Sequence, residues 1–170
     1  MKSSYAKNNY NLIFAELAKD SKFIVEFGIL NGYSLKAFAE SGNEVCAYDL
    51  FDDYAYNHPR YIDLVATFWK YDNVMILKGD FYKEHIHFKD NEIDLLHIDI
   101  SNTGEVFRYA VEYWLPKVRG VMVLEGGSIE RDKVDWMIKY KKEPINEYLK
   151  SSGLDYEIIE KYPSLTIIKK

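Results

Sequence analysis

The feature of this chain that most constrains its fold is a buried strand that passes through two glycines directly into a helix. Residues 23–28 are mostly apolar, and residues 33–41 have the composition of a helix. Gly28 and Gly32 bracket the turn between them. Glycine lets the backbone approach a ligand closely, and a helix N-terminus directs N–H groups at the same place. Because ligands of open α/β sheets bind at the carboxyl ends of the strands, this turn is predicted to bind one.

The spacing of this turn differs from that of a dinucleotide-binding turn. It is Glu26-x-Gly28-x-x-x-Gly32-x-Ser34, whereas the dinucleotide fingerprint is Gly-x-Gly-x-x-Gly. A carboxylate within a buried strand needs a partner, because burying an unpaired charge costs free energy. The turn backbone, a ligand amine or both can supply that partner for Glu26.

Strand and helix patterns alternate along the chain, which predicts an α/β domain with a mainly parallel sheet. The last two strands are separated only by residues 161–163, a link too short for a parallel crossover, so we expect an antiparallel hairpin. Further strands are expected at 44–50, 74–77, 93–98, 118–124, 156–160 and 164–169, and helices at 8–19, 59–71, 103–115 and 130–150, the last with a break allowed near Pro144.

Composition limits the classes of partner and compartment. The chain has 170 residues, enough for one domain, and its net charge of −5 without a Lys/Arg cluster argues against a nucleic-acid partner. No apolar run approaches the roughly 20 residues that span a bilayer, which predicts no membrane partner. The single cysteine, Cys46, and the polar first ten residues predict a cytoplasmic protein.

Together these motifs resemble class I S-adenosylmethionine-dependent methyltransferases. The narrower resemblance is to the small macrocin-O-methyltransferase-like group, whose first motif is Val-Glu-x-Gly-x-x-x-Gly-x-Ser. The resemblance implies a Rossmann-like, doubly wound, mainly parallel seven-stranded sheet with an antiparallel C-terminal hairpin. It covers a single domain over residues 21–170, with residues 1–20 as an N-terminal helical extension. It also implies S-adenosylmethionine as cofactor and transfer of its methyl group to an oxygen of a small molecule, with a nitrogen as the alternative. A homo-oligomer is left open.

Several positions are expected to contact the cofactor. Asp49 ends the second predicted strand, at about the offset from Gly28 where nucleotide-binding α/β folds place a ribose-binding acid. The alternative for Asp49 is an ordinary strand-end acid in a turn. The resemblance implies that Gly79 and Asp80 lie beside the adenine, with Phe81 either stacked on it or in the core. The predicted cofactor-binding residues are Glu26, Gly28, Gly32, Ser34, Asp49, Leu50, Gly79, Asp80 and Phe81.

The fourth strand ends in His97 and Asp99, where the resemblance places the methyl acceptor. We predict Asp99 as a general base, with His97 as the alternative catalytic group. A histidine on such a strand is also often a hydrogen-bonded core residue, so this reading of His97 stays open.

Metal use is not expected from the residues that follow. The Asp-His of the resembled group is replaced by Ser101 and Asn102, and the fifth strand ends in Glu125 and Gly126, where metal-using relatives have two ligands. If a metal binds, its ligands are Asp99 and Glu125. These departures motivate one rival, a non-catalytic cofactor- or partner-binding domain; the other rival is a nicotinamide-dependent reductase, against which the missing third glycine argues.

Overall fold

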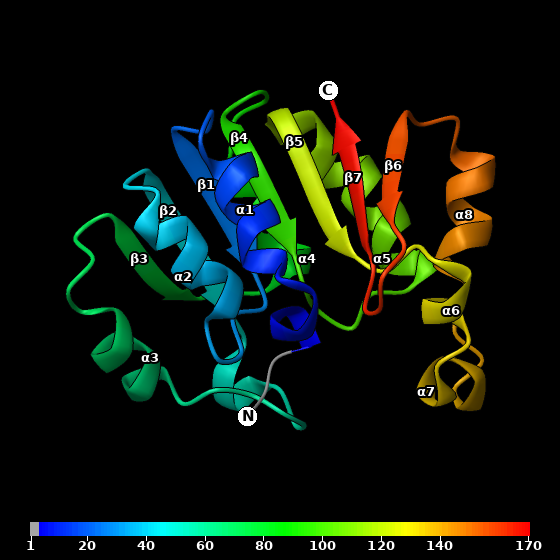
Figure 1. Cartoon of the computed structure of the whole chain (residues 1–170), viewed down its shortest axis with the longest axis horizontal. Helices are drawn as coiled ribbons and strands as arrows, with labels where there is room; N and C mark the ends of the chain where they lie inside the picture. The colour runs from blue at the N-terminus through cyan, green and yellow to red at the C-terminus, as the bar shows by residue number, and fades with distance from the viewer. Residues whose placement is uncertain (1–3) are drawn as a thin grey trace.

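The computed structural model describes residues 4–170 and confirms the predicted sheet. Seven strands run in the order β3-β2-β1-β4-β5-β7-β6 (Figure 1). Pairs among β1 to β5 are parallel, whereas β7 pairs antiparallel with both β5 and β6. The strands are β1 (Phe23–Phe27), β2 (Glu44–Asp49), β3 (Val74–Lys78), β4 (Ile93–Ile98), β5 (Val118–Glu125), β6 (Tyr156–Ile159) and β7 (Leu165–Lys169).

Helices cover both faces of the sheet because side chains alternate between its faces along each strand. On β1, Ile24 packs in a core cluster with Phe14 of α1, whereas its neighbour Val25 packs in a second cluster with Trp114. Helices α1 to α3 contribute to the first cluster, and α4, α5 and α8 to the second. The helices are α1 (Tyr10–Ala18), α2 (Tyr33–Glu40), α3 (Tyr61–Phe68), α4 (Phe81–Glu84), α5 (Gly104–Tyr109), α6 (Ile129–Asp132), α7 (Asp135–Lys139) and α8 (Ile145–Ser152).

The break that the prediction allowed near Pro144 is present, because α8 begins at Ile145, but the rest of the predicted helix over residues 130–150 is wrong. The chain forms three short helices there, α6, α7 and α8, and Lys141 adopts a left-handed conformation with φ of 49°. The Asp132 carboxylate accepts hydrogen bonds from the backbone N–H groups of Ile145 (2.9 Å) and Asn146 (2.8 Å). It thereby caps the N-terminus of α8 from a distant position, which fixes where α8 begins. The predicted helix over 103–115 is α-helical only as α5 and continues as a π-helical turn, Ala110–Trp114.

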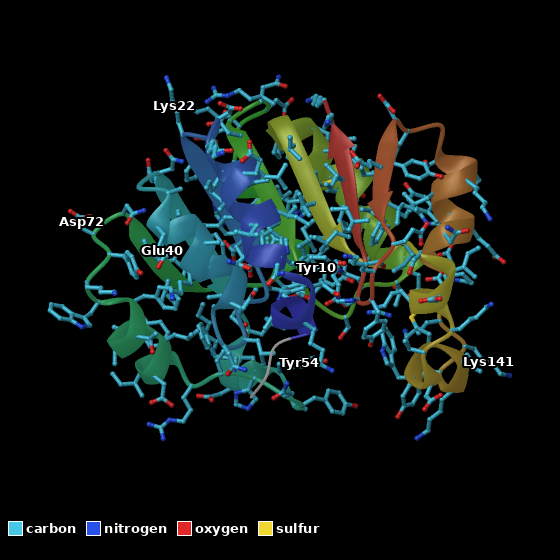
Figure 2. All side chains as sticks on the ribbon, in the orientation of Figure 1. Tyr10, Lys22, Glu40, Tyr54, Asp72 and Lys141 are labelled. Carbon is cyan, nitrogen blue, oxygen red and sulfur yellow. The ribbon has the colours of Figure 1, made fainter. Side chains whose placement is uncertain are left out.

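The described part of the N-terminal segment packs against the fold. A 3-10 turn, η1 (Ser4–Asn8), lies below the arrowheads of β1 and β4, where the parallel strands end (Figure 1). Tyr5 and Phe14 are buried in the first core cluster, and the Tyr10 hydroxyl donates to the Lys161 carbonyl. Figure 2 shows Tyr10 and Tyr54 toward this end of the sheet and Lys22 at the opposite end. No helix within residues 4–170 is long and apolar enough to cross a membrane.

At the opposite end of the sheet, Asp94 ties together the starts of three strands. From β4 it accepts the backbone N–H groups of Lys22 (2.9 Å) and Phe23 (3.0 Å) at the start of β1. It also pairs with Arg119 of β5, whose Nη2 lies 3.0 Å from it. The hydrogen bond from Arg119 lowers the pKa of Asp94 from 3.8 to about 2, and the two backbone donors act in the same direction.

We expect this contact to make stability depend on pH in acid. Because the pKa of Asp94 is lower in the folded chain, its contribution is present above pH 3.8 and is lost as the pH falls toward 2. The free energy of unfolding of Asp94→Asn, measured with urea, should lie well below wild type at pH 5. The gap should narrow at pH 2.

The matched control is Asp72→Asn, at an exposed acid. It should follow wild type at both pH values. A gap between wild type and Asp94→Asn that stays constant from pH 5 to pH 2 would contradict the assignment.

Candidate cofactor site and active site

The glycine turn after β1 is fixed by close backbone contacts. The Gly28 N–H donates to the Tyr48 carbonyl of β2 (2.9 Å), and Gly28 has φ of +87°. A Cβ at Gly28 would stand 1.9 Å from the carbonyl oxygen of Asp99, where β4 has just ended. Gly32, with φ of +71°, lies against the Phe68 ring, which a Cβ would approach to 2.5 Å. Both positions therefore require glycine, for conformation and for space.

Asp49 holds this turn from the neighbouring strand. One carboxylate oxygen accepts the N–H groups of Ile29 (2.9 Å) and Leu30 (3.4 Å), and the other accepts the N–H of Phe51 (2.9 Å). Asp49 therefore joins the loop after β1 to the loop after β2. The sequence offered two interpretations of Asp49, a ribose ligand and a turn acid, and the turn role is present in the structure.

A cavity of about 400 Å³ opens at the carboxyl ends of β1, β2, β3 and β4. This volume is in the range of small-molecule sites. Its lining comprises Phe27, Gly28, Leu30, Tyr48, Asp49, Leu50, Tyr54, Tyr56, Asn57, Gly79, Asp80, Phe81, Tyr82, Asp99, Ile100, Ser101 and Val106. Of the predicted site residues, Gly28, Asp49, Leu50, Gly79, Asp80, Phe81 and Asp99 meet at this cavity, whereas Glu26, Gly32, Ser34 and His97 are not in its lining.

Glu26 and His97 form a buried pair beneath α1 and α2. Both side chains are fully buried, and His97 Nδ1 lies 2.9 Å from Glu26 Oε1. The Ser34 hydroxyl donates to the same oxygen. The His97 ring packs against Phe14, with centroids 4.8 Å apart. One oxygen of the Glu26 carboxylate, Oε1, thus finds its partners within the protein, on the sheet face that α1 and α2 cover.

Asp99 lies at the cavity wall within an acidic environment. Burial raises the pKa of Asp99 well above its usual value of 3.8, and the negative charge of Glu125 raises it further. The neighbouring Tyr5 hydroxyl acts on the pKa of Asp99 in the opposite direction and lowers it. Glu125 is itself paired with Arg131, whose Nε and Nη2 each lie 3.2 Å from Oε1.

These acids do not assemble into a larger ligand set. Asp99 and Glu125 are neighbours, as expected for the ends of β4 and β5. Within residues 4–170, no group of three or more His, Cys, Asp or Glu side chains is arranged to hold a metal ion. The acid pair instead has the Arg131 guanidinium beside it, and Arg131 is only 4% exposed.

Three residues of the loop after β2 reach the cavity without having been predicted: Tyr54, Tyr56 and Asn57. The Tyr54 hydroxyl lies 3.0 Å from the Ser101 hydroxyl, so this loop meets the loop after β4 at the cavity. The Tyr54 and Tyr56 rings contact edge to face, with centroids 5.4 Å apart. A tyrosine-bearing polar loop has no periodicity that would mark it as a cavity wall, and its placement depends on the distant Ser101.

The fold resembles those of several solved methyltransferases. A protein provisionally assigned as a caffeoyl-CoA O-methyltransferase, from Staphylococcus aureus, matches with a TM-score of 0.69 and 18% identity, over 100% of this chain and 85% of that one. An O-methyltransferase from Bacillus cereus, solved with S-adenosylhomocysteine, matches with a TM-score of 0.64 and 16% identity, over 100% and 83% of the two chains. A Podospora anserina methyltransferase, also bound to S-adenosylhomocysteine, has a TM-score of 0.64 and 14% identity, over 99% and 79%. No protein-family model and no curated protein sequence matches the chain.

At these identities the likeness establishes the fold. The chain has the mainly parallel, seven-stranded sheet with an antiparallel C-terminal hairpin that the sequence predicts, and these methyltransferases share that architecture.

Gly28→Ala should disrupt this site through its contact with Asp99. The new methyl group meets a backbone oxygen that cannot move without shifting the end of β4, and we expect a loss of about 2–4 kcal/mol in unfolding free energy. Urea titration measures this loss.

Gly42→Ala is the matched control, because Gly42 has φ of +77° but nothing within 4 Å of its Cβ position. It should lose only the conformational cost of a left-handed alanine, about 1 kcal/mol. Equal losses for the two variants would show that the contact with Asp99 is unimportant.

Proposed function

We propose that this protein is an S-adenosylmethionine-dependent methyltransferase that methylates an oxygen of a small molecule. The observation that carries the proposal is the cavity, which joins a glycine turn to carboxylates from three strand ends. Asp49, Asp80 and Asp99 line it, and the lining residues within 4–170 include no lysine, arginine or histidine. The narrower resemblance to the macrocin-O-methyltransferase-like group rests on the first motif and is part of this proposal.

The charge of the cavity favours this cofactor over a nicotinamide dinucleotide. A dinucleotide carries a pyrophosphate, which three carboxylates would repel and which no cation among the described lining residues would bind. S-adenosylmethionine carries a sulfonium and an ammonium group, both suited to an acidic cavity. The S-adenosylhomocysteine complexes of the Bacillus cereus and Podospora anserina proteins support the same cofactor class.

The backbone of the turn is shaped to fit such a ligand. Gly28 lines the cavity without a side chain, so a ligand can lie directly against the main chain there. In the proposal Asp49 receives the ribose hydroxyls while it holds the turn, since a carboxylate has lone pairs beyond those that its backbone donors use. Gly79, Asp80 and Phe81 would lie beside the adenine.

Asp99 is the residue proposed to handle the acceptor proton. The cofactor supplies an activated methyl group, and most of the catalysis then comes from positioning the acceptor oxygen. The raised pKa of Asp99 makes its carboxylate a stronger base than an ordinary aspartate. In the proposed reaction, the Asp99 carboxylate accepts the proton of the acceptor hydroxyl as the oxygen takes up the methyl group.

Binding of the cofactor product is the first test. We expect isothermal titration calorimetry to give a dissociation constant for S-adenosylhomocysteine in the micromolar range, roughly −7 to −8 kcal/mol. NADH should give no signal. Tight binding of NADH with no response to S-adenosylhomocysteine would instead favour the nicotinamide-dependent reductase.

Two substitutions separate the roles of Asp99 and His97. Asp99→Asn should lower kcat by roughly 100-fold or more with nearly unchanged cofactor affinity, because general-base catalysis contributes about that much. Its readout is turnover of radiolabelled cofactor with an acceptor found by screening.

His97→Gln keeps a hydrogen-bond donor for Glu26 and should lose thermal stability but keep most of the kcat of wild type. Loss of turnover in a folded His97→Gln protein would return the catalytic role to His97. Full activity of Asp99→Asn would remove Asp99 from the mechanism.

A further inference from the structure

We propose that the cavity selects its ligand by charge, so that it binds S-adenosylmethionine, with a net positive charge, more tightly than the product S-adenosylhomocysteine, whose net charge is zero. This inference rests on the proposed function and adds a property of the same site. The two molecules have nearly the same shape. They differ in one methyl group and in the positive charge that the sulfur carries only while it is methylated.

The first argument is where the acids of the cavity come from. Asp49 is the last residue of β2, Asp80 follows β3 and Asp99 follows β4, so the acids that line the cavity come from separate strands. The three acids therefore lie on different walls of the cavity and do not form one cluster in the sequence. A ligand in the cavity therefore lies among carboxylates from several of its walls.

The second argument is that the cations near the cavity do not line it and so do not face a ligand bound among its carboxylates. Lys83 lies 3.0 Å from Asp80, but its side chain is 78% exposed and is outside the cavity lining. Arg131 is paired with Glu125. Neither provides a cation that faces the ligand.

The third argument concerns the acids behind the wall. Burial is the main cause that raises the pKa of Asp99, and the charges of Glu125 and Glu26 behind it add to the rise. Phe27 and Phe81 add apolar surface to the lining of the same cavity. A cavity lined by charges of one sign with apolar walls focuses the field on whatever occupies it.

The consequence is a site that releases its product readily. The neutral thioether sulfur of S-adenosylhomocysteine gains nothing from this field, whereas the sulfonium of S-adenosylmethionine does, and the ammonium and carboxylate groups are common to both. We expect S-adenosylmethionine to bind about tenfold more tightly than S-adenosylhomocysteine, a difference of about 1.4 kcal/mol.

The test compares three ligands by isothermal titration calorimetry on the full chain. They are S-adenosylmethionine, S-adenosylhomocysteine and sinefungin, which has a cationic amine in place of the sulfonium and does not transfer a methyl group. Both cationic ligands should bind more tightly than S-adenosylhomocysteine. Use of sinefungin ensures that turnover does not contribute to the difference.

Two variants test which carboxylates cause the preference. Asp80→Asn keeps the side-chain oxygen that accepts the Tyr82 N–H at the start of α4, and Asp99→Asn keeps the size of its side chain. Each should lower the ratio of the two affinities by about two- to threefold. Asp72→Asn removes a charge from an exposed position at the far edge of the molecule (Figure 2) and should leave the ratio unchanged.

The outcomes distinguish this inference from the proposed function. If S-adenosylhomocysteine binds as tightly as both cationic ligands, or more tightly, charge selection is wrong and the cofactor assignment stands. If the preference is present but unchanged in Asp80→Asn and Asp99→Asn, these acids do not cause it and the inference is wrong. If none of the three ligands binds, the proposed function fails and the inference fails with it.

Discussion

The site depends on the contact between Gly28 and the end of β4. The Asp99 N–H donates to the Phe27 carbonyl (2.8 Å), and the Asp99 carbonyl lies where a side chain of Gly28 would stand. On its other side, Gly28 donates to Tyr48 of β2. The turn is thus held between the two strands that flank β1, and this brings Asp49 and Asp99 to the same cavity. A larger residue at Gly28 would separate them.

The charged groups near the strand ends divide into two sets with different roles. Glu26 and His97 are fully buried partners, and removing one would leave the other uncompensated in the core. Asp99, two residues beyond His97, reaches the cavity and interacts there with Tyr5 and Glu125. One step of strand periodicity therefore separates a structural pair from the carboxyl group proposed to act on substrate.

The sequence predicts features with local causes and misses those that depend on distant partners. The strands and the glycine turn have local signals, in apolar runs and in glycine conformation. Pro144 is a local signal for the start of α8, whereas the cap of that helix is Asp132, whose partner Ile145 is 13 residues away. The partner of Glu26 is 71 residues away, at His97, and that of Tyr54 is 47 residues away, at Ser101. Such pairings become visible only once the sheet order is known.

The measurement that tests the central claim most directly is a crystal structure of the protein grown with S-adenosylhomocysteine. The account predicts that the ligand lies in the cavity against the backbone of Gly28. Its ribose should lie at Asp49 and its sulfur should point toward Asp99. Glu26 and His97 should remain paired with each other beneath α1. A ligand that occupies another part of the molecule, or that reaches Glu26 by breaking its contact with His97, would contradict the account.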